Sequence, residues 1–236
     1  MRKLSHALQH LYDKCIYHWA LRNNHRFTKY LRSKGIAIGD GCTFQEGVCI
    51  DTTRPSLVTI GNNVRMNKNF TLLTHDFGTS VFRLKYYEFI PSSGKVNIGN
   101  NVYFAQKCTV LKGVTIGDNC IIGYGSIVTK SIPSNTVAVG CPARVLCTLD
   151  EYFDKRKSRC LEEAFEYAKS IVDRYHRRPT INDFWEEFPL FVDGKDADKY
   201  PGIPIRSQLD IGFEKWSSNH QAPYKNFEDF LLAAGL

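Results

Sequence analysis

The chain has 236 residues, 43% of them hydrophobic, which suffices for one substantial core with appendages. No apolar run approaches the ~20 residues that cross a membrane, and the start, MRKLSHALQHLYDKC, lacks the apolar core of a secretory signal. These features argue against a membrane-spanning or exported protein, and we expect a cytoplasmic one. The net charge of +7 is concentrated at the N-terminal end.

Residues 1–34 are predicted to form a basic amphipathic helical segment. The segment holds eight basic side chains and one acidic side chain, and apolar residues recur at helical spacing. These apolar residues are Leu4, Leu8, Leu11, Cys15 and Trp19. The segment would cap the next domain or pack on a neighbouring subunit; the alternative is peripheral contact with an anionic membrane surface. The basic stretch is short and carries no binding motif, so we expect no nucleic-acid partner.

Residues 35–148 carry an internal repeat with a period of six. Apolar side chains occupy every sixth position in three runs, which begin at Ile38, Ile60 and Ile98. Turns rich in Gly, Asn and Asp separate them, such as Gly61-Asn62-Asn63. A short strand followed by a tight turn fits this period, and three such strands would close one triangular coil. Stacked coils bury their inward residues against each other, and we expect about four coils.

The segment from Ile98 to Leu146 contains GVTIGDN, GSIVTKSIP and GCPARV in that order. It resembles the hexapeptide-repeat acyltransferases, and among them the branch of galactoside, maltose and capsular-polysaccharide O-acetyltransferases. The resemblance covers roughly residues 36–146. It implies a left-handed parallel β-helix, acetyl-CoA as co-substrate, and a homotrimer with active sites between neighbouring β-helices. The period itself does not show the hand of the helix.

Two other classes share this repeat. The γ-class carbonic anhydrases need a zinc site of three histidines, and the repeat region holds one histidine, His75. We therefore expect no metal. A non-catalytic trimeric β-helix scaffold stays open as an alternative.

An insertion at residues 74–95 interrupts the repeat. It begins with Thr74-His75-Asp76 at the end of a predicted strand, and long loops that leave a rigid scaffold are often functional. Histidine ordinarily titrates near neutral pH, which suits removal of a proton from an attacking hydroxyl. The resemblance implies that His75 is the catalytic base of a direct transfer in a ternary complex. Asp76 is interpreted as a turn former.

The resemblance also assigns residues to acetyl-CoA and to the acceptor. The cofactor positions are Ala105, Tyr124, Gly125, Ser126, Thr129, Lys130 and Arg144. Lys130 and Arg144 would meet the CoA phosphates, whereas Tyr124 departs from the small residue that the family has there. The acceptor positions are Gln45 and Asp51, in a region where residues 52–57 break the repeat.

Residues 149–236 are predicted to be a helical and irregular extension. A helix is expected from Asp150 to before Pro179, and a short one near the C-terminus. Between them lie seven aromatic residues: Phe184, Trp185, Phe188, Phe191, Tyr200, Phe213 and Trp216. We interpret these as core residues, with a platform for sugars as the alternative.

Together these features predict an acetyl-CoA-dependent O-acetyltransferase. Its acceptor would be a carbohydrate hydroxyl in a capsule, lipopolysaccharide or exopolysaccharide precursor. The first alternative is an N-acetyltransferase that acts on an amino sugar nucleotide, and His75 does not discriminate between the two. The second is the non-catalytic scaffold.

Overall fold

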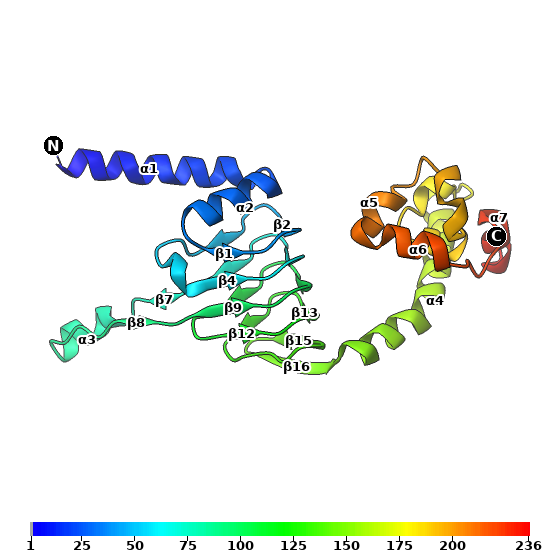
Figure 1. The fold of residues 1–236 in the computed structure, drawn as a ribbon. Helices are drawn as coiled ribbons and strands as arrows, with labels where there is room; N and C mark the ends of the chain where they lie inside the picture. The colour runs from blue at the N-terminus through cyan, green and yellow to red at the C-terminus, as the bar shows by residue number, and fades with distance from the viewer. Residues whose placement is uncertain (1) are drawn as a thin grey trace. The chain divides into compact units, whose positions relative to one another are not determined.

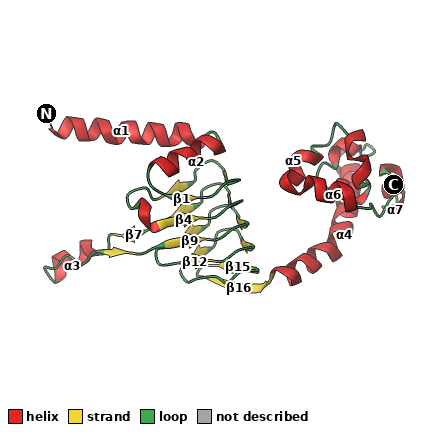
Figure 2. Ribbon diagram, viewed as in Figure 1, coloured by secondary structure: helices red, strands yellow, loops and turns green. Residues whose placement is uncertain are grey.

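The computed structural model describes residues 2–236, and the side chains of residues 11, 12 and 14–236. The chain forms two compact units, the first ending at Phe153 and the second spanning Asp154–Leu236. In the first unit, short strands are stacked beneath two N-terminal helices (Figure 1; Figure 2).

The strands of the first unit build three parallel sheets, because successive strands enter the first, second and third sheet in rotation. The first sheet contains β1 (Ala37–Ile38), β4 (Val58–Ile60), β9 (Val96–Ile98) and β12 (Thr115–Ile116). The second contains β2 (Thr43–Phe44), β5 (Arg65–Met66), β10 (Val102–Phe104), β13 (Cys120–Ile122), β15 (Thr136–Gly140) and β16 (Ala143–Thr148). The third contains β3 (Cys49–Ile50), β6 (Thr71–Leu72), β11 (Thr109–Val110) and β14 (Ile127–Val128). Only β16 is antiparallel to its neighbour, β15, among these strands.

The six-residue frame points into the space between the sheets. Its twelve residues are between 0% and 8% exposed: Ile38, Phe44, Ile50, Ile60, Met66, Leu72, Ile98, Phe104, Val110, Ile116, Ile122 and Val128. These inward positions are confirmed as predicted. Each two- or three-residue strand therefore contributes its apolar side chain to one continuous core.

Polar residues form a ladder at the edge where the chain passes from the first sheet to the second. Asp40 N–H donates to Asn62 Oδ1 (2.9 Å), Asn62 N–H to Asn100 Oδ1 (2.9 Å), and Asn100 N–H to Asp118 Oδ1 (2.6 Å). Each side chain thereby satisfies a backbone donor of the adjacent coil. The Gly-Asn and Gly-Asp dipeptides of the repeat are hence both turn formers and hydrogen-bonding partners between coils.

Two helices, α1 (Arg2–Leu21) and α2 (Asn24–Ser33), cover the first coil. Phe27 and Leu31 are fully buried in the same core as the strands, and the Phe27 ring meets that of Phe44 at 4.8 Å between centroids. Tyr17 donates its hydroxyl to the Val48 carbonyl (3.0 Å). This packing supports the capping role.

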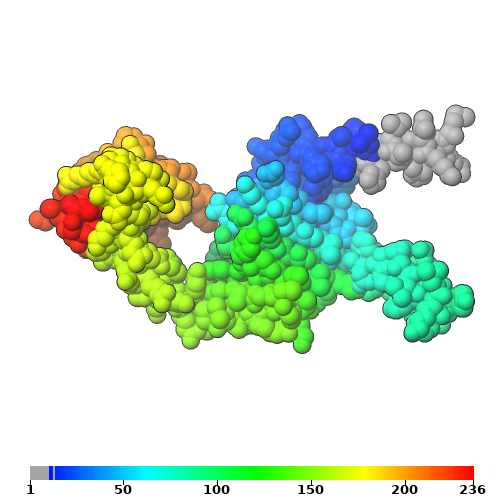
Figure 3. All heavy atoms as spheres, turned by 180° about the vertical axis from the view of Figure 1, so that it is seen from behind, coloured from blue at the N-terminus to red at the C-terminus, as the bar shows by residue number. Residues whose placement is uncertain are grey.

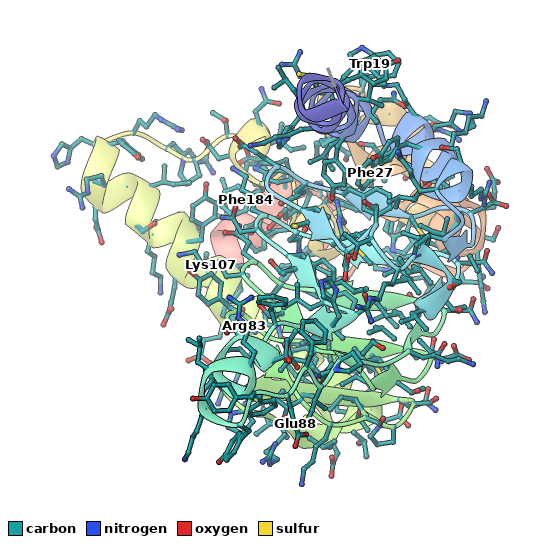
Figure 4. All side chains as sticks on the ribbon, turned by 90° about the vertical axis from the view of Figure 1, so that its left-hand side faces the viewer. Trp19, Phe27, Arg83, Glu88, Lys107 and Phe184 are labelled. Carbon is teal, nitrogen blue, oxygen red and sulfur yellow. The ribbon has the colours of Figure 1, made fainter. Side chains whose placement is uncertain are left out.

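The predicted apolar stripe is not the surface that packs. Leu11 and Trp19 are 58% and 55% exposed, and Trp19 lies on the side of α1 away from the strands (Figure 4). The Leu4 and Leu8 side chains lie outside the described residues. Tyr17 and Ala20 make the contacts instead, because the second helix brings its own apolar residues to the coil.

The 74–95 insertion projects from the stacked strands. It consists of β7 (His75–Asp76), α3 (Thr79–Lys85) and β8 (Ser92–Ser93), with β7 and β8 paired antiparallel. We call residues 77–91, which join the two strands, the arm; Figure 3 shows it standing clear of the stacked strands. Many of its apolar side chains are more than half exposed: Phe77, Val81, Leu84, Tyr86, Tyr87, Phe89 and Ile90.

The second unit is helical. The long helix α4 (Leu149–Tyr175) leads into it, followed by α5 (Ile205–Leu209), α6 (Phe213–Asn219) and α7 (Phe227–Ala233) and several short 3₁₀ turns. Phe184, Phe188, Phe191 and Phe213 are buried in its core, as the core interpretation expects. Trp185 is the exception, since it is 47% exposed.

The close approach of coils at the glycine turns gives a stability prediction. A Cβ at Gly61 would lie 2.5 Å from the Gly99 carbonyl oxygen, whereas Gly212 has nothing within 4 Å. We expect Gly61→Ala to destabilise the protein by roughly 1–3 kcal/mol, because backbone must move to admit the methyl group. Gly212→Ala is the control and should leave unfolding nearly unchanged. Equal denaturant midpoints for the two variants would contradict this account.

Candidate active site

Two interruptions of the repeat occur at the same edge of the β-helix. The chain leaves the third sheet after Ile50 and again after Leu72, and each time it inserts residues before it rejoins the first sheet. We call this the third–first edge. Since Ile50 is paired with Leu72 in register, Asp51 and the Thr74-His75 pair begin their insertions in adjacent coils.

The Asp51 carboxylate binds the imidazole of His75. His75 Nδ1–H donates to Asp51 Oδ2 at 2.7 Å. Thr74 donates to the same oxygen through its backbone N–H (3.2 Å) and its hydroxyl. The other carboxylate oxygen accepts from the Thr53 N–H (2.9 Å) and hydroxyl (2.6 Å).

These hydrogen bonds set the protonation of the pair. Burial alone would raise the pKa of Asp51, but the hydrogen bonds from Thr53, Thr74 and His75 outweigh it and hold that pKa well below its ordinary value. An ionised carboxylate only accepts, so Nδ1 carries the proton in the neutral ring and Nε2 is the basic nitrogen. The Asp51 side chain is 5% exposed and that of His75 is 34% exposed, so the imidazole is the part of the pair that solvent reaches.

The other predicted site residues lie on two different edges. Thr129 and Lys130 follow β14 on the third–first edge, the same edge as His75, and both are exposed. Four others lie where the chain turns from the second sheet to the third: Gln45, Ala105, Tyr124 and Gly125. Arg144 is the second residue of β16, which follows the hairpin turn from β15, and it is exposed. Within one chain, the structure does not bring the two groups together.

Ser126 does not suit the predicted role in cofactor binding. It is fully buried, and its hydroxyl donates to the Gly123 carbonyl (2.6 Å) and accepts from Gly140 N–H (3.1 Å). Its backbone N–H and carbonyl are bonded to Gly123 and Thr109. These groups are therefore committed to the coil, because Ser126 occupies an inward position of the repeat.

Asp51 was predicted to bind the acceptor, but in the structure its carboxylate is the hydrogen-bonding partner of His75. Both of its oxygens accept hydrogen bonds from protein groups, so the carboxylate orients His75 and offers little to a sugar hydroxyl. Their places in the repeat do not point to this pairing, because Asp51 directly follows the inward Ile50 whereas His75 comes three residues after the inward Leu72. Gln45, the other predicted acceptor residue, accepts from Lys68 N–H through its side-chain oxygen (3.2 Å).

Tyr124 keeps its ring outside the coil. The side chain is 62% exposed, and Lys107 Nζ lies 5.6 Å from the ring centroid. The ring that departs from the family pattern therefore lies on the surface of the second–third edge rather than in the core. Figure 4 shows Lys107 on the outside of the stacked strands.

The described residues hold no cluster of three or more His, Cys, Asp or Glu side chains that could bind a metal ion. Among the helices in the described part of the chain, none has the length and apolarity to cross a membrane.

Comparison with known proteins agrees with the hexapeptide repeat. Residues 95–130 match the family described as bacterial transferase hexapeptide (six repeats). Protein CapG of Staphylococcus aureus is 34% identical over 160 residues, which cover 66% of this chain and 88% of CapG. Galactoside O-acetyltransferase of Escherichia coli is 41% identical over 99 residues, covering 40% of this chain and 45% of that enzyme. A solved galactoside acetyltransferase in complex with coenzyme A aligns with a TM-score of 0.41 at 24% identity, over 61% of this chain and 82% of the other.

The stacked short parallel strands and the matching family model define a hexapeptide-repeat transferase. The chain belongs to the hexapeptide-repeat acyltransferase family and is an acyltransferase.

The Asp51 hydrogen bonds predict a pH-dependent contribution to stability. A carboxyl whose pKa is lower in the folded chain stabilises the fold above its unfolded value of about 3.9, and this contribution is lost as the pH falls below that value. We expect Asp51→Asn to lower the Tm by several degrees at pH 7 and by progressively less below pH ~4. Asp40→Asn, at a carboxylate that is 88% exposed, is the control. A Tm difference for Asp51→Asn that stays constant from pH 3 to pH 7 would show that ionisation is not involved.

Proposed function

We propose that this protein is an acetyl-CoA-dependent O-acetyltransferase that acts on a carbohydrate hydroxyl, with His75 as general base. The observation that carries the proposal is the 2.7 Å hydrogen bond from His75 Nδ1 to the buried Asp51 carboxylate. It fixes the ring and its tautomer, and leaves Nε2 as the atom that can accept a proton. A thioester is already activated, so the acceptor hydroxyl needs only to be deprotonated as it attacks.

The proposed reaction is a direct transfer. His75 Nε2 removes the proton of the acceptor hydroxyl while its oxygen bonds to the acetyl carbonyl carbon. The carbon–sulfur bond then breaks, CoA leaves as the thiolate, and the imidazolium returns the proton to it. The negative charge of Asp51 stabilises the imidazolium between these steps. A backbone N–H of an adjacent coil would stabilise the oxyanion, and no covalent acyl-enzyme is needed.

The separation of the two edges supports a site shared between copies of the chain. The pantetheine positions Ala105, Tyr124 and Gly125 lie on the second–third edge, whereas His75 and Lys130 lie on the third–first edge. If one acetyl-CoA uses both groups, a second copy must supply one of them. We therefore propose a homotrimer in which the third–first edge of each copy faces the second–third edge of the next. The exposed apolar residues of the arm, which begins beside His75, would be covered by that neighbour.

The acceptor class rests on the galactoside O-acetyltransferase relative. We propose a sugar unit of a capsule, lipopolysaccharide or exopolysaccharide precursor, modified in the cytoplasm, where acetyl-CoA is available. The rival acceptor is an amine of an amino sugar nucleotide, which His75 would serve equally well.

Thiol release from acetyl-CoA with a sugar acceptor tests the reaction. We expect His75→Ala to lower kcat by about 10²–10⁴-fold, with the Kd for acetyl-CoA little changed. The probes are p-nitrophenyl galactoside and maltose for hydroxyl transfer, and UDP-linked amino sugars for amine transfer. His25→Ala, at an exposed histidine of α2, is the matched control. Release with the amino sugars alone would favour the N-acetyltransferase, and no release with any acceptor would favour the scaffold.

Thermal unfolding with acetyl-CoA tests the cofactor site. A ligand at a hundred times its Kd stabilises the folded state by about 2.7 kcal/mol, and we expect a corresponding rise in Tm for the wild type. Lys130→Ala and Arg144→Ala should each reduce that rise, because each removes a phosphate partner. Lys169→Ala, at an exposed lysine of the second unit, is the control. No rise at millimolar acetyl-CoA would overturn the transferase proposal.

A further inference from the structure

His75 lies on a two-stranded ribbon that has contacts on both faces. In the antiparallel pair of β7 and β8, His75 is opposite Ser93 and Asp76 is opposite Ser92. Successive residues of a strand point to opposite faces, so His75 turns toward Asp51 while Asp76 and Ser92 share the other face. A ribbon of two strands is marginal by itself, and its position depends on what holds each face.

Lys112 holds the second face. It lies in the turn between β11 and β12, on the third–first edge. Its ammonium group donates to the Asp76 carboxylate and to the Ser92 hydroxyl, which belong to opposite strands of the ribbon. Asp76 Oδ1 also accepts from Gly78 N–H (3.0 Å), so the same carboxylate orders the first turn of the arm.

The backbone beside Lys112 also contacts the ribbon. A Cβ at Gly94 would lie 2.8 Å from the Gly113 nitrogen, which shows how closely the two segments approach. Gly94 N–H donates to the Thr74 carbonyl, and Gly113 N–H donates to the Lys95 carbonyl, both at 2.9 Å. The end of the ribbon is therefore tied to the turn that carries Lys112, and the side-chain contacts extend this attachment toward His75.

We propose that Lys112 is a positioning residue for His75. Lys112, Asp76 and Ser92 form a clamp that holds the ribbon against the coil, while Asp51 and Thr74 hold it from the other face. The inference rests on the proposed role of His75 as base. The clamp fixes the direction of the imidazole, and it keeps the Asp76 charge compensated in the residue next to the base.

Charge compensation gives the clamp a measurable signature. Among the described residues, the charged groups that contact the ribbon next to His75 are Asp51 on one face, and Asp76 with Lys112 on the other. If Lys112 loses its charge, the uncompensated Asp76 carboxylate favours the protonated imidazole. The basic form of His75 would then appear only at higher pH. Removing the Asp76 charge as well should cancel this effect, while the ribbon would remain loose.

Hydrogen exchange measures the mechanical part of the clamp in the full-length protein. We expect Lys112→Met to speed amide exchange at residues 75–76 and 92–94 by about threefold or more, because local opening becomes easier. Asp76→Asn/Lys112→Met should behave in the same way. Lys112→Arg, which keeps the charge and donors, should stay near wild type. Lys95→Met removes an exposed lysine of the same edge outside the clamp and is the matched control.

Carbethoxylation of His75 by diethyl pyrocarbonate, followed by mass spectrometry against pH, measures the electrostatic part without any acceptor. We expect the pH midpoint of the reaction to rise by roughly half a unit in Lys112→Met. It should return to the wild-type midpoint in Asp76→Asn/Lys112→Met. A purely structural role would change the reactivity but not the midpoint. The proposal would be overturned if Lys112→Met and Lys95→Met showed the same amide exchange and the same pH midpoint.

Turnover separates this inference from the proposed function. Where p-nitrophenyl galactoside or maltose supports thiol release, we expect Lys112→Met to lower kcat about tenfold with the KM for acetyl-CoA unchanged, and Lys112→Arg to restore it. A rise in KM with kcat unchanged would instead assign Lys112 to cofactor binding and overturn the positioning role. Wild type without turnover would count against the transferase proposal, while the exchange and midpoint results would still decide the clamp.

Discussion

The stacking of inward residues in register is the constraint on which the structure of the first unit depends. Each short strand must present one apolar side chain to the core, so residues cannot be added within a strand without exposing that core. Additional chain can leave only at the edges between sheets. Both long interruptions, residues 52–57 and 74–95, leave at the third–first edge, one coil apart. The hydrogen-bonded pair of Asp51 and His75 lies at this edge, where the repeat admits inserted residues.

The same register creates the pair of Asp51 and His75. The two residues are 24 positions apart in the sequence, yet the pairing of Ile50 with Leu72 places the starts of their insertions side by side. The backbone hydrogen bonds between coils hold the two residues in these positions in advance, so the pair needs no rearrangement when a substrate reacts. Lys112 is positioned in the same way, because it lies at the third–first edge in the turn between β11 and β12.

The sequence predicts the core well and the site in part. Periodicity finds the twelve positions of the six-residue frame because burial is repeated in each coil. Ser126 lies outside that frame, and its burial commits its polar groups to the coil rather than to a cofactor. The contact of Asp51 with His75 could not be predicted, because residues 52–57 hide the register between the two coils. Lys112 was missed because its partner Asp76 lies 36 positions away, and the contact depends on how the arm returns. On α1, helical spacing predicted an apolar stripe, but the residues that pack against the core are Tyr17 and Ala20.

The rigidity of the coil also bears on where a complete site can form. His75 and Tyr124 lie on different edges, and each edge is fixed by strands whose inward residues are almost fully buried. Moving one edge to the other would require the core to open, which costs far more than a binding step can supply. A cofactor that needs both groups must therefore find them on two copies of the chain. The exposed apolar arm begins beside His75, so the surface that the proposed association would bury adjoins the residue that the proposed site needs.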